Sequence, residues 1–138
     1  MRRLIFILLC FVALPAQADL VLVANPRSGI EQLSRNEVVN IYLGRYRMLA
    51  SGLTAEPLDQ PYESEMRESF YKHLVDKSLS QISAYWSRLV FSGKIHPPRV
   101  VNTPAEAVAE VAKYPGVLAY VDRSQVDHRV RIVFEFGK

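Results

Sequence analysis

Residues Thr103–Val121, TPAEAVAEVAKYPGVLAYV, contain the clearest indication of the fold class of this 138-residue chain. Thr103 is a favourable N-cap, Pro104 suits the first helical position and Glu106 completes a capping box, so these residues predict the start of a helix. The Pro-Gly pair further along ends that helix, and the apolar run Val117–Val121 then predicts a strand. A capped helix that leads directly into an apolar strand is typical of α/β proteins.

The same alternation of strand and helix extends over the whole chain. Leu20–Ala24, LVLVA, is apolar at every position, which predicts a strand buried on both faces. Further strands are predicted at Glu56–Gln60, Arg99–Val101 and Val130–Phe136. Further helices are predicted after the caps Ser34 and Ser64 and over Leu79–Phe91. The order β-α-β-α-α-β-α-β-β indicates an α/β sandwich around a mostly parallel or mixed sheet, with no internal repeat and no interdomain linker.

Residues 1–18 have the pattern of a cleavable secretory signal peptide. Arg2 and Arg3 form a positive n-region, Leu4–Leu14 is an apolar run, and Ala16-Gln17-Ala18 is a small-x-small cleavage pattern. Eleven apolar residues reach only about 17 Å as a helix, short of the ~30 Å hydrocarbon core, so a permanent transmembrane anchor is the weaker interpretation.

A lipoprotein is a further alternative, because Cys10 lies in the apolar run. Leu9 stands where a small residue normally precedes a lipidated cysteine, which disfavours this alternative. We therefore expect export to the periplasm and a single domain over residues 19–138.

Charge and cysteine content both change when the signal peptide is set aside. The whole chain has 17 basic and 14 acidic residues; without Arg2 and Arg3 the balance is 15 to 14, and the net charge falls from +3 to +1. A nearly neutral domain is a poor candidate for a dedicated nucleic-acid binder. Cys10 is the only cysteine, so the exported domain is expected to have neither a disulfide nor a catalytic thiol.

The sequence offers little that indicates catalysis. It has no nucleophile elbow, no phosphate-binding P-loop and no dinucleotide-binding glycine pattern, and its three histidines are not spaced as metal ligands: His73, His96 and His128. Three aspartates are expected in loops, as ordinary turn residues: Asp59, Asp122 and Asp127. We therefore expect no enzymatic activity, no metal and no cofactor.

Two features could contact an anion. Arg45, Tyr46 and Arg47 lie in one predicted loop, from which they could bind an anion or an acidic protein, although a solvated surface is the alternative. Ser64 opens a predicted helix, and the backbone N–H groups at a helix N-terminus favour anions. Plain helix capping is the alternative for Ser64, and the glutamates on either side of it would oppose an anion.

Four stretches in the same order together resemble the substrate-binding proteins of phosphate ABC transporters, a family of the type 2 periplasmic-binding-protein superfamily. They are Leu33–Gly44, Pro57–Phe70, Ala84–Gly93 and Tyr114–Val121. The first is similar to a family helix that ends in "I-F-x-G", the third to "YW…F-x-G" and the fourth to "P-G-A-I-G-Y-V". The resemblance implies a three-layer α/β sandwich that corresponds to a single lobe of this superfamily.

The chain departs from the family pattern in two respects. The phosphate-carrying relatives are about twice as long and close two lobes around the ligand, whereas this chain has the length of one lobe. The family's anion loop runs roughly Arg-x-x-Gly-Ser-Gly-Thr into a helix; here Gln60 takes the place of the arginine, Glu63 and Glu65 replace the glycines, and only Ser64 matches. The ligand-binding residues that we predict are Ser64, Arg45 and Arg47.

Two functions remain open from the sequence. In the first, the domain captures phosphate or another small oxyanion in the periplasm and presents it to an ABC permease or a sensor. In the second, it is a non-transport accessory or signalling module that acts with an envelope sensor or channel. A single lobe would expose its half of the cleft, which could then bind such a partner or a second copy in a homodimer.

Overall fold

The computed structural model describes residues 19–93 and 95–137, and the predicted signal peptide, residues 1–18, lies outside the described residues. The helices and strands, in chain order, are β1 (Leu20–Ala24), the 3₁₀ turn η1 (Pro26–Ser28), α1 (Arg35–Tyr42), β2 (Glu56–Asp59), α2 (Glu65–Val75), α3 (Leu79–Phe91), β3 (Arg99–Val100), α4 (Pro104–Lys113), β4 (Val117–Asp122), η2 (Arg123–Gln125) and β5 (Arg131–Glu135). Within the described residues, no helix has the length and apolar character needed to cross a membrane.

One five-stranded mixed sheet, in the order β3-β2-β4-β1-β5, organises the chain. β2 pairs in parallel with both β3 and β4, and β1 pairs antiparallel with both β4 and β5. β1 therefore lies inside the sheet, and all five of its residues are buried, as its unbroken apolar run predicts.

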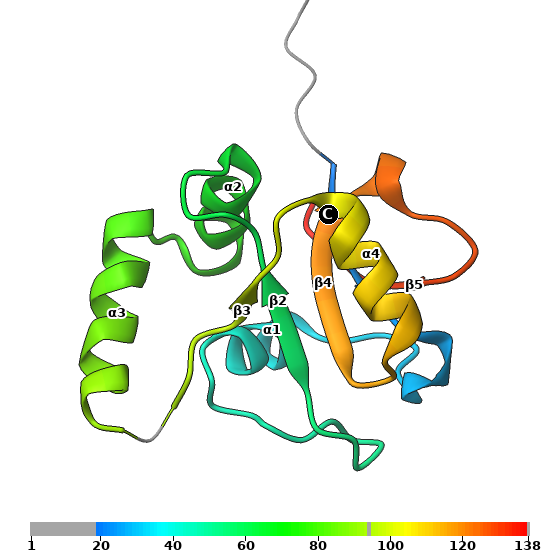
Figure 1. The fold of residues 1–138 in the computed structure, drawn as a ribbon, viewed down its shortest axis with the longest axis horizontal. Helices are drawn as coiled ribbons and strands as arrows, with labels where there is room; N and C mark the ends of the chain where they lie inside the picture. The colour runs from blue at the N-terminus through cyan, green and yellow to red at the C-terminus, as the bar shows by residue number, and fades with distance from the viewer. Residues whose placement is uncertain (1–18, 94, 138) are drawn as a thin grey trace, which may run out of the picture.

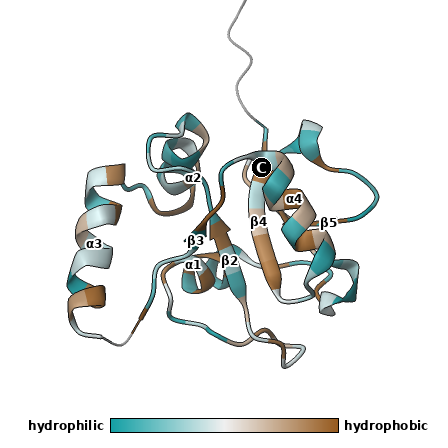
Figure 2. Cartoon of the chain, in the orientation of Figure 1, coloured by the Kyte–Doolittle hydropathy of each residue, from teal (hydrophilic) through white to brown (hydrophobic). Residues whose placement is uncertain are grey.

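Helices cover both faces of this sheet, which gives the expected three-layer sandwich (Figure 1). Successive side chains of a strand point to opposite faces, so β1 contributes Leu20 and Leu22 to one core and Val21 and Val23 to the other. The first core also contains the buried residues of α1, α2 and α3, and the second contains those of α4. In Figure 2, the apolar colour on β4 is flanked by mixed colouring on α4, as expected for a helix with one buried side.

The predicted order of elements is confirmed, and so are the helix starts. Ser34 forms a full capping box with Glu37, Ser64 accepts a hydrogen bond from the backbone N–H of Arg67, and Thr103 accepts one from the backbone N–H of Glu106. The bounds of the strands differ from the predicted ones by a single residue at a few ends: β2, β3 and β5 are shorter than predicted, and β4 extends to Asp122, which pairs with Leu20.

The turn between α4 and β4 brings two backbone segments unusually close together. The carbonyl of Gly116 accepts a hydrogen bond of 2.9 Å from the backbone N–H of Glu56, where β2 begins. A Cβ atom built on Gly116 would lie 2.2 Å from the backbone carbonyl oxygen of Thr54. Only glycine lets these segments meet, which sets the start of the β2–β4 pairing.

We therefore expect Gly116→Ala to lower the free energy of unfolding by about 1–3 kcal/mol, because a backbone atom must move to make room for the methyl group. Urea unfolding followed by circular dichroism measures the change. Gly137→Ala is the matched control, since a Cβ atom there meets nothing within 4 Å. Equal unfolding midpoints for the two variants would contradict the close-approach argument.

Candidate functional site

A buried carboxylate ends β2. Asp59 is the last residue of that strand and only 3% exposed, so the expectation that it is a turn residue is wrong. Its backbone carbonyl accepts a hydrogen bond of 2.9 Å from the N–H of Val101, beyond the end of β3. The strand pairing thus holds the aspartate in the interior of the molecule, where a charge needs compensation.

Arg67, in the first turn of α2, supplies that compensation. Its Nε lies 3.2 Å from Asp59 Oδ2, and both side chains are 4% exposed. Ser64 fixes the start of the helix, because its Oγ accepts a hydrogen bond of 3.3 Å from the backbone N–H of Arg67. The helix cap therefore positions the arginine that neutralises the aspartate.

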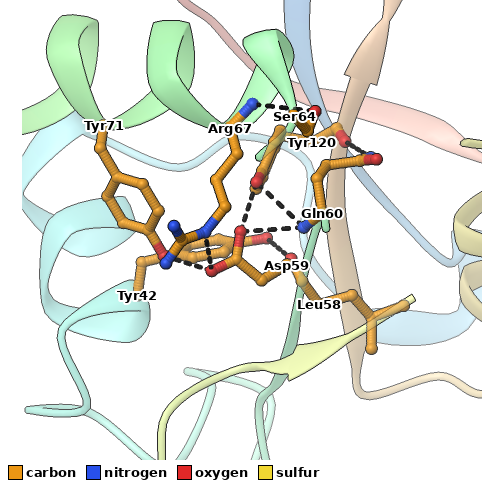
Figure 3. A network of polar contacts seen from close by, with 8 residues as sticks. All are labelled: Tyr42, Leu58, Asp59, Gln60, Ser64, Arg67, Tyr71 and Tyr120. Atoms are coloured by element: carbon orange, nitrogen blue, oxygen red, sulfur yellow. Dashed lines mark hydrogen bonds and ion pairs between the residues drawn. The ribbon is translucent and has the colours of Figure 1, made fainter. Parts of the chain in front are cut away.

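Asp59 accepts three more hydrogen bonds besides that of Arg67 (Figure 3). The Tyr71 hydroxyl donates to Oδ2 at 2.8 Å, the Tyr120 hydroxyl donates to Oδ1, and the backbone N–H of Gln60 donates to Oδ1 at 2.9 Å. The Gln60 side-chain Nε2 also donates to the Tyr120 backbone carbonyl at 3.2 Å. We call these five residues the Asp59 network; it joins β2, α2 and β4.

The tyrosines of this region stay protonated over the ordinary pH range. Burial first, and the Asp59 charge second, raise the pKa of Tyr71 and that of Tyr120 above the usual value for tyrosine. The same two causes raise the pKa of Tyr42, whose hydroxyl donates to the Leu58 carbonyl at 2.9 Å. The three hydroxyls are therefore fixed hydrogen-bond donors to strand β2 and its terminal carboxylate.

Only part of the Arg67 guanidinium group takes part in the network. Within residues 19–93 and 95–137, the hydrogen bonds of its side chain involve Nε alone, which leaves Nη1 and Nη2 without acceptors. The rings of Tyr62 and Tyr71 lie beside the group, with their centroids 5.0 Å and 5.3 Å from Cζ. A buried guanidinium with unused donors is able to bind an anion.

Arg67 and Asp59 line a groove beside α3, which we call the α3 groove. Its volume is about 750 Å³. The lining residues come from the ends of β2 and β3, from α2 and from α3: Asp59, Tyr62, Arg67, Ser83, Trp86, Ser87, Val90, Phe91, Pro97, Pro98 and Val100. Trp86 is 6% exposed, and its buried Nε1–H has no hydrogen-bond partner among the described residues. The groove therefore combines the Arg67 guanidinium with a largely apolar wall.

The predicted ligand-binding residues are not brought together. Ser64 follows the C-terminal end of β2, whereas the backbone carbonyl of Arg47 accepts a hydrogen bond of 2.9 Å from Ala55, just before β2 begins. Arg47 and Arg45 line two other hollows: Arg47 lies near Pro97 and Arg99, and Arg45 lies between α1 and α3. Ligand binding by these three residues stays a prediction.

Ser64 also lacks the cation that an anion site at the start of α2 would need. In Figure 3 the Arg67 side chain extends away from Ser64 Oγ, toward Asp59 and Tyr71. Gln60, which takes the place of the arginine in the family pattern, is 3% exposed and hydrogen-bonded to Tyr120. The positive charge of this region therefore belongs to Arg67, which pairs with Asp59 and lines the α3 groove.

Sequence reasoning missed Arg67, although a signal for it exists. The predicted apolar stripe of α2 is Met66, Phe70, Tyr71 and Leu74, but positions 67, 70, 71 and 74 are the ones that the structure buries. An arginine three and four residues before two buried aromatic residues faces the core and needs an acidic partner.

Among the described residues, no group of three or more histidine, aspartate or glutamate side chains could hold a metal ion.

Removing the carboxylate should destabilise the protein strongly. We expect Asp59→Asn to lower the free energy of unfolding by about 3–5 kcal/mol, because it leaves the buried Arg67 charge unpaired. Urea unfolding measures this loss. Asp76→Asn is the control: Asp76 pairs with Lys72 at 2.6 Å with 83% of its side chain exposed, so the midpoint should not move. A small effect of Asp59→Asn would show that the ion pair does not hold α2 to the sheet.

The raised pKa values of the tyrosines predict a loss of stability in alkali. Below pH ~10, the usual tyrosine pKa, both the folded and the unfolded states keep the protons and the contribution is fully present. Above it, the unfolded state ionises while the buried Tyr71 and Tyr120 do not, so each lowers the free energy of unfolding by about 1.4 kcal/mol per pH unit.

Urea unfolding at several pH values between about 9 and 11 measures this slope. Tyr71→Phe should make the slope shallower, because it removes one of the groups that ionise only on unfolding. An unchanged slope in this variant would contradict the assignment.

Known structures resemble the described fold closely. No protein-family model matches the chain, and no curated protein matches it either. The fold does match an ABC-type phosphate transport receptor from Vibrio cholerae, with a TM-score of 0.67 and 17% sequence identity. It also matches a Clostridium perfringens protein assigned as a phosphate ABC transporter substrate-binding protein and solved with bound phosphate (TM-score 0.66, 13% identity), and PstS from Borrelia burgdorferi (TM-score 0.65, 12% identity).

These matches cover 84% of this chain but only 44–46% of each of the three known chains. The chain thus spans less than half the length of the proteins that it resembles, and at this level of identity the likeness establishes the fold and not the ligand. The resemblance expected from the sequence is confirmed: the chain has the fold of a single lobe of the phosphate-transporter substrate-binding proteins.

Proposed function

We propose that this protein is a periplasmic binding protein, not an enzyme, and that it binds a small oxyanion such as phosphate through Arg67. The observation that carries the proposal is the guanidinium group of Arg67, which is held at Nε by Asp59 while Nη1 and Nη2 have no acceptor among the described residues. Planar pairs of N–H donors match the two oxygens of a phosphate or a carboxylate.

The surroundings of Arg67 support this role. Asp59 already accepts four hydrogen bonds, so its carboxylate is satisfied and anchors the arginine in one orientation. Preorganisation of this kind lowers the entropy that a ligand must remove when it binds. In addition, the groove in front of Arg67 has a volume of about 750 Å³, within the usual range of small-molecule sites.

The residues predicted from the sequence have secondary roles in this proposal. Ser64 acts on the anion indirectly, because it caps the helix turn from which Arg67 projects. Arg45 and Arg47 lie at other hollows of the surface, where they would contact the ABC permease or envelope sensor to which the loaded protein is presented.

A second function, that of an accessory module for an envelope sensor or channel, also has an observation in its favour. The rim of the α3 groove exposes large apolar side chains: Phe91 is 95% exposed, Tyr62 64% and Val90 47%. Clustered exposed apolar residues often mark protein-binding surfaces. Co-purification of an envelope protein that is lost on Phe91→Ser, with no anion binding, would favour this second function.

The proposed function predicts that the purified protein binds phosphate or sulfate and that Arg67→Lys weakens this binding at least about tenfold. Lysine keeps a positive charge near Asp59 but loses the pair of Nη donors. Isothermal titration calorimetry measures the affinity, and circular dichroism confirms that the variant is folded. Arg88→Gln, which removes an exposed arginine from α3, is the control and should bind as the unsubstituted protein does. Equal anion binding by Arg67→Lys would overturn the assignment of Arg67.

A further inference from the structure

The wall of the α3 groove favours a ligand that is apolar on one side. Val90, Phe91, Pro97, Pro98 and Val100 present carbon surface. A bound phosphate ion has four oxygens, and those that do not reach Arg67 would lose their water against this wall. Desolvated polar groups without partners cost free energy, so we expect an anion with an apolar body to bind in this groove more tightly than phosphate does.

The charge of the groove sets a second limit. Arg67 carries one positive charge, and Asp59 beside it carries one negative charge. The pair is neutral together, so a singly charged ligand leaves less charge unbalanced in the groove than a doubly ionised phosphate does. A single carboxylate needs only two donors in a plane, which is what Nη1 and Nη2 offer.

The donors and the apolar wall occur in the same groove. Arg67 lines it together with Val90, Phe91 and Pro97. Figure 2 shows apolar colouring at the C-terminal end of α3, where Val90 and Phe91 form part of the rim. A ligand that fits both features has an acidic end and a hydrophobic body.

From these observations we propose that the α3 groove binds a monoanionic carboxylate with an aliphatic or aromatic body, whose carboxylate pairs with Arg67 and whose body packs against Phe91 and the Pro97-Pro98 wall. This inference rests on the proposed function in one point, the anion-binding role of Arg67, and specifies the class of ligand. The same chemistry is offered by a free organic acid and by the C-terminal residue of a peptide.

Trp86 makes the proposal directly measurable. It is the only tryptophan of the chain and lines both the α3 groove and the hollow beside Arg47, so a fluorescence change that is lost on Phe91→Ser reports occupancy of the α3 groove. We expect N-acetylleucine to change this fluorescence and to bind at least about tenfold more tightly than N-acetylleucinamide, whose neutral amide cannot form the charge-assisted pair with Arg67. A leucine-terminated peptide with a free or an amidated C-terminus shows whether the peptide is the better source of the carboxylate.

Two variants test the two halves of the site without a large risk to folding. Phe91→Ser should weaken N-acetylleucine binding about fivefold or more, because it removes apolar contact area. Met48→Ser removes another exposed apolar residue, one that lines a different hollow, and should have no effect. Arg67→Lys should weaken the binding of N-acetylleucine, which carries the carboxylate, and leave the weak binding of N-acetylleucinamide unchanged.

Inorganic phosphate, titrated in the same assay, separates this inference from the proposed function. Binding of N-acetylleucine with the stated dependence on the carboxylate and on Phe91 supports the inference. Binding of phosphate but not of N-acetylleucine overturns the inference and leaves the proposed function standing. Binding of neither overturns both, and equal binding of the acid and its amide overturns the role of Arg67 in the groove.

Discussion

The ion pair between Asp59 and Arg67 constrains how α2 packs against the sheet. An arginine on the core side of α2 is tolerable only if a carboxylate meets it, because an unpaired charge in the interior is far more costly than any packing gain. The pair therefore fixes where α2 begins relative to the end of β2. Tyr120 extends the same constraint to β4, since its hydroxyl donates to Asp59 and its ring stacks on Phe70 at 3.8 Å. One carboxylate thus determines how a helix and two strands come together.

In this arrangement Arg67 has a structural contact and a ligand-binding group on different nitrogen atoms. The Asp59 network uses Nε of the guanidinium, Nη1 and Nη2 have no acceptor among the described residues, and Arg67 lines the α3 groove. If Asp59 accepted hydrogen bonds from all the guanidinium nitrogens, Arg67 would have a structural role only. Because Asp59 is saturated by donors from α2, from β4 and from the backbone of Gln60, a ligand at Nη1 and Nη2 does not have to compete with the fold for Arg67, and binding and stability can be altered by different substitutions.

The fold could be predicted from the sequence because its signals are local. The N-caps Ser34, Ser64 and Thr103 predict helix starts from residues next to them in the sequence. The apolar run of β1 likewise predicts a buried strand. The site was not predicted, because its members are distant or conflict with a local rule: Tyr120 meets Asp59 across 61 positions, and Arg67 occupies a place that the helical period reserves for apolar residues. Ser64, Arg45 and Arg47 each fit an anion site by residue type, but β2 runs between the first and the other two. Residue type suggests which chemistry is available, and only the topology decides which groups meet.

The likeness to phosphate-binding proteins can therefore coexist with a different ligand. The start of a helix against the end of a strand is a feature of the backbone, and it is kept here by the Ser64 cap and the Asp59–Arg67 pair. Binding of phosphate at that helix start would require glycines that admit the anion, whereas this chain has Glu63 and Glu65 there. The charge lies one turn further into the helix, on Arg67, and faces a groove with apolar walls. In this fold the Arg67 guanidinium thus lies beside apolar side chains. These neighbours, more than the positive charge itself, determine which anion can bind.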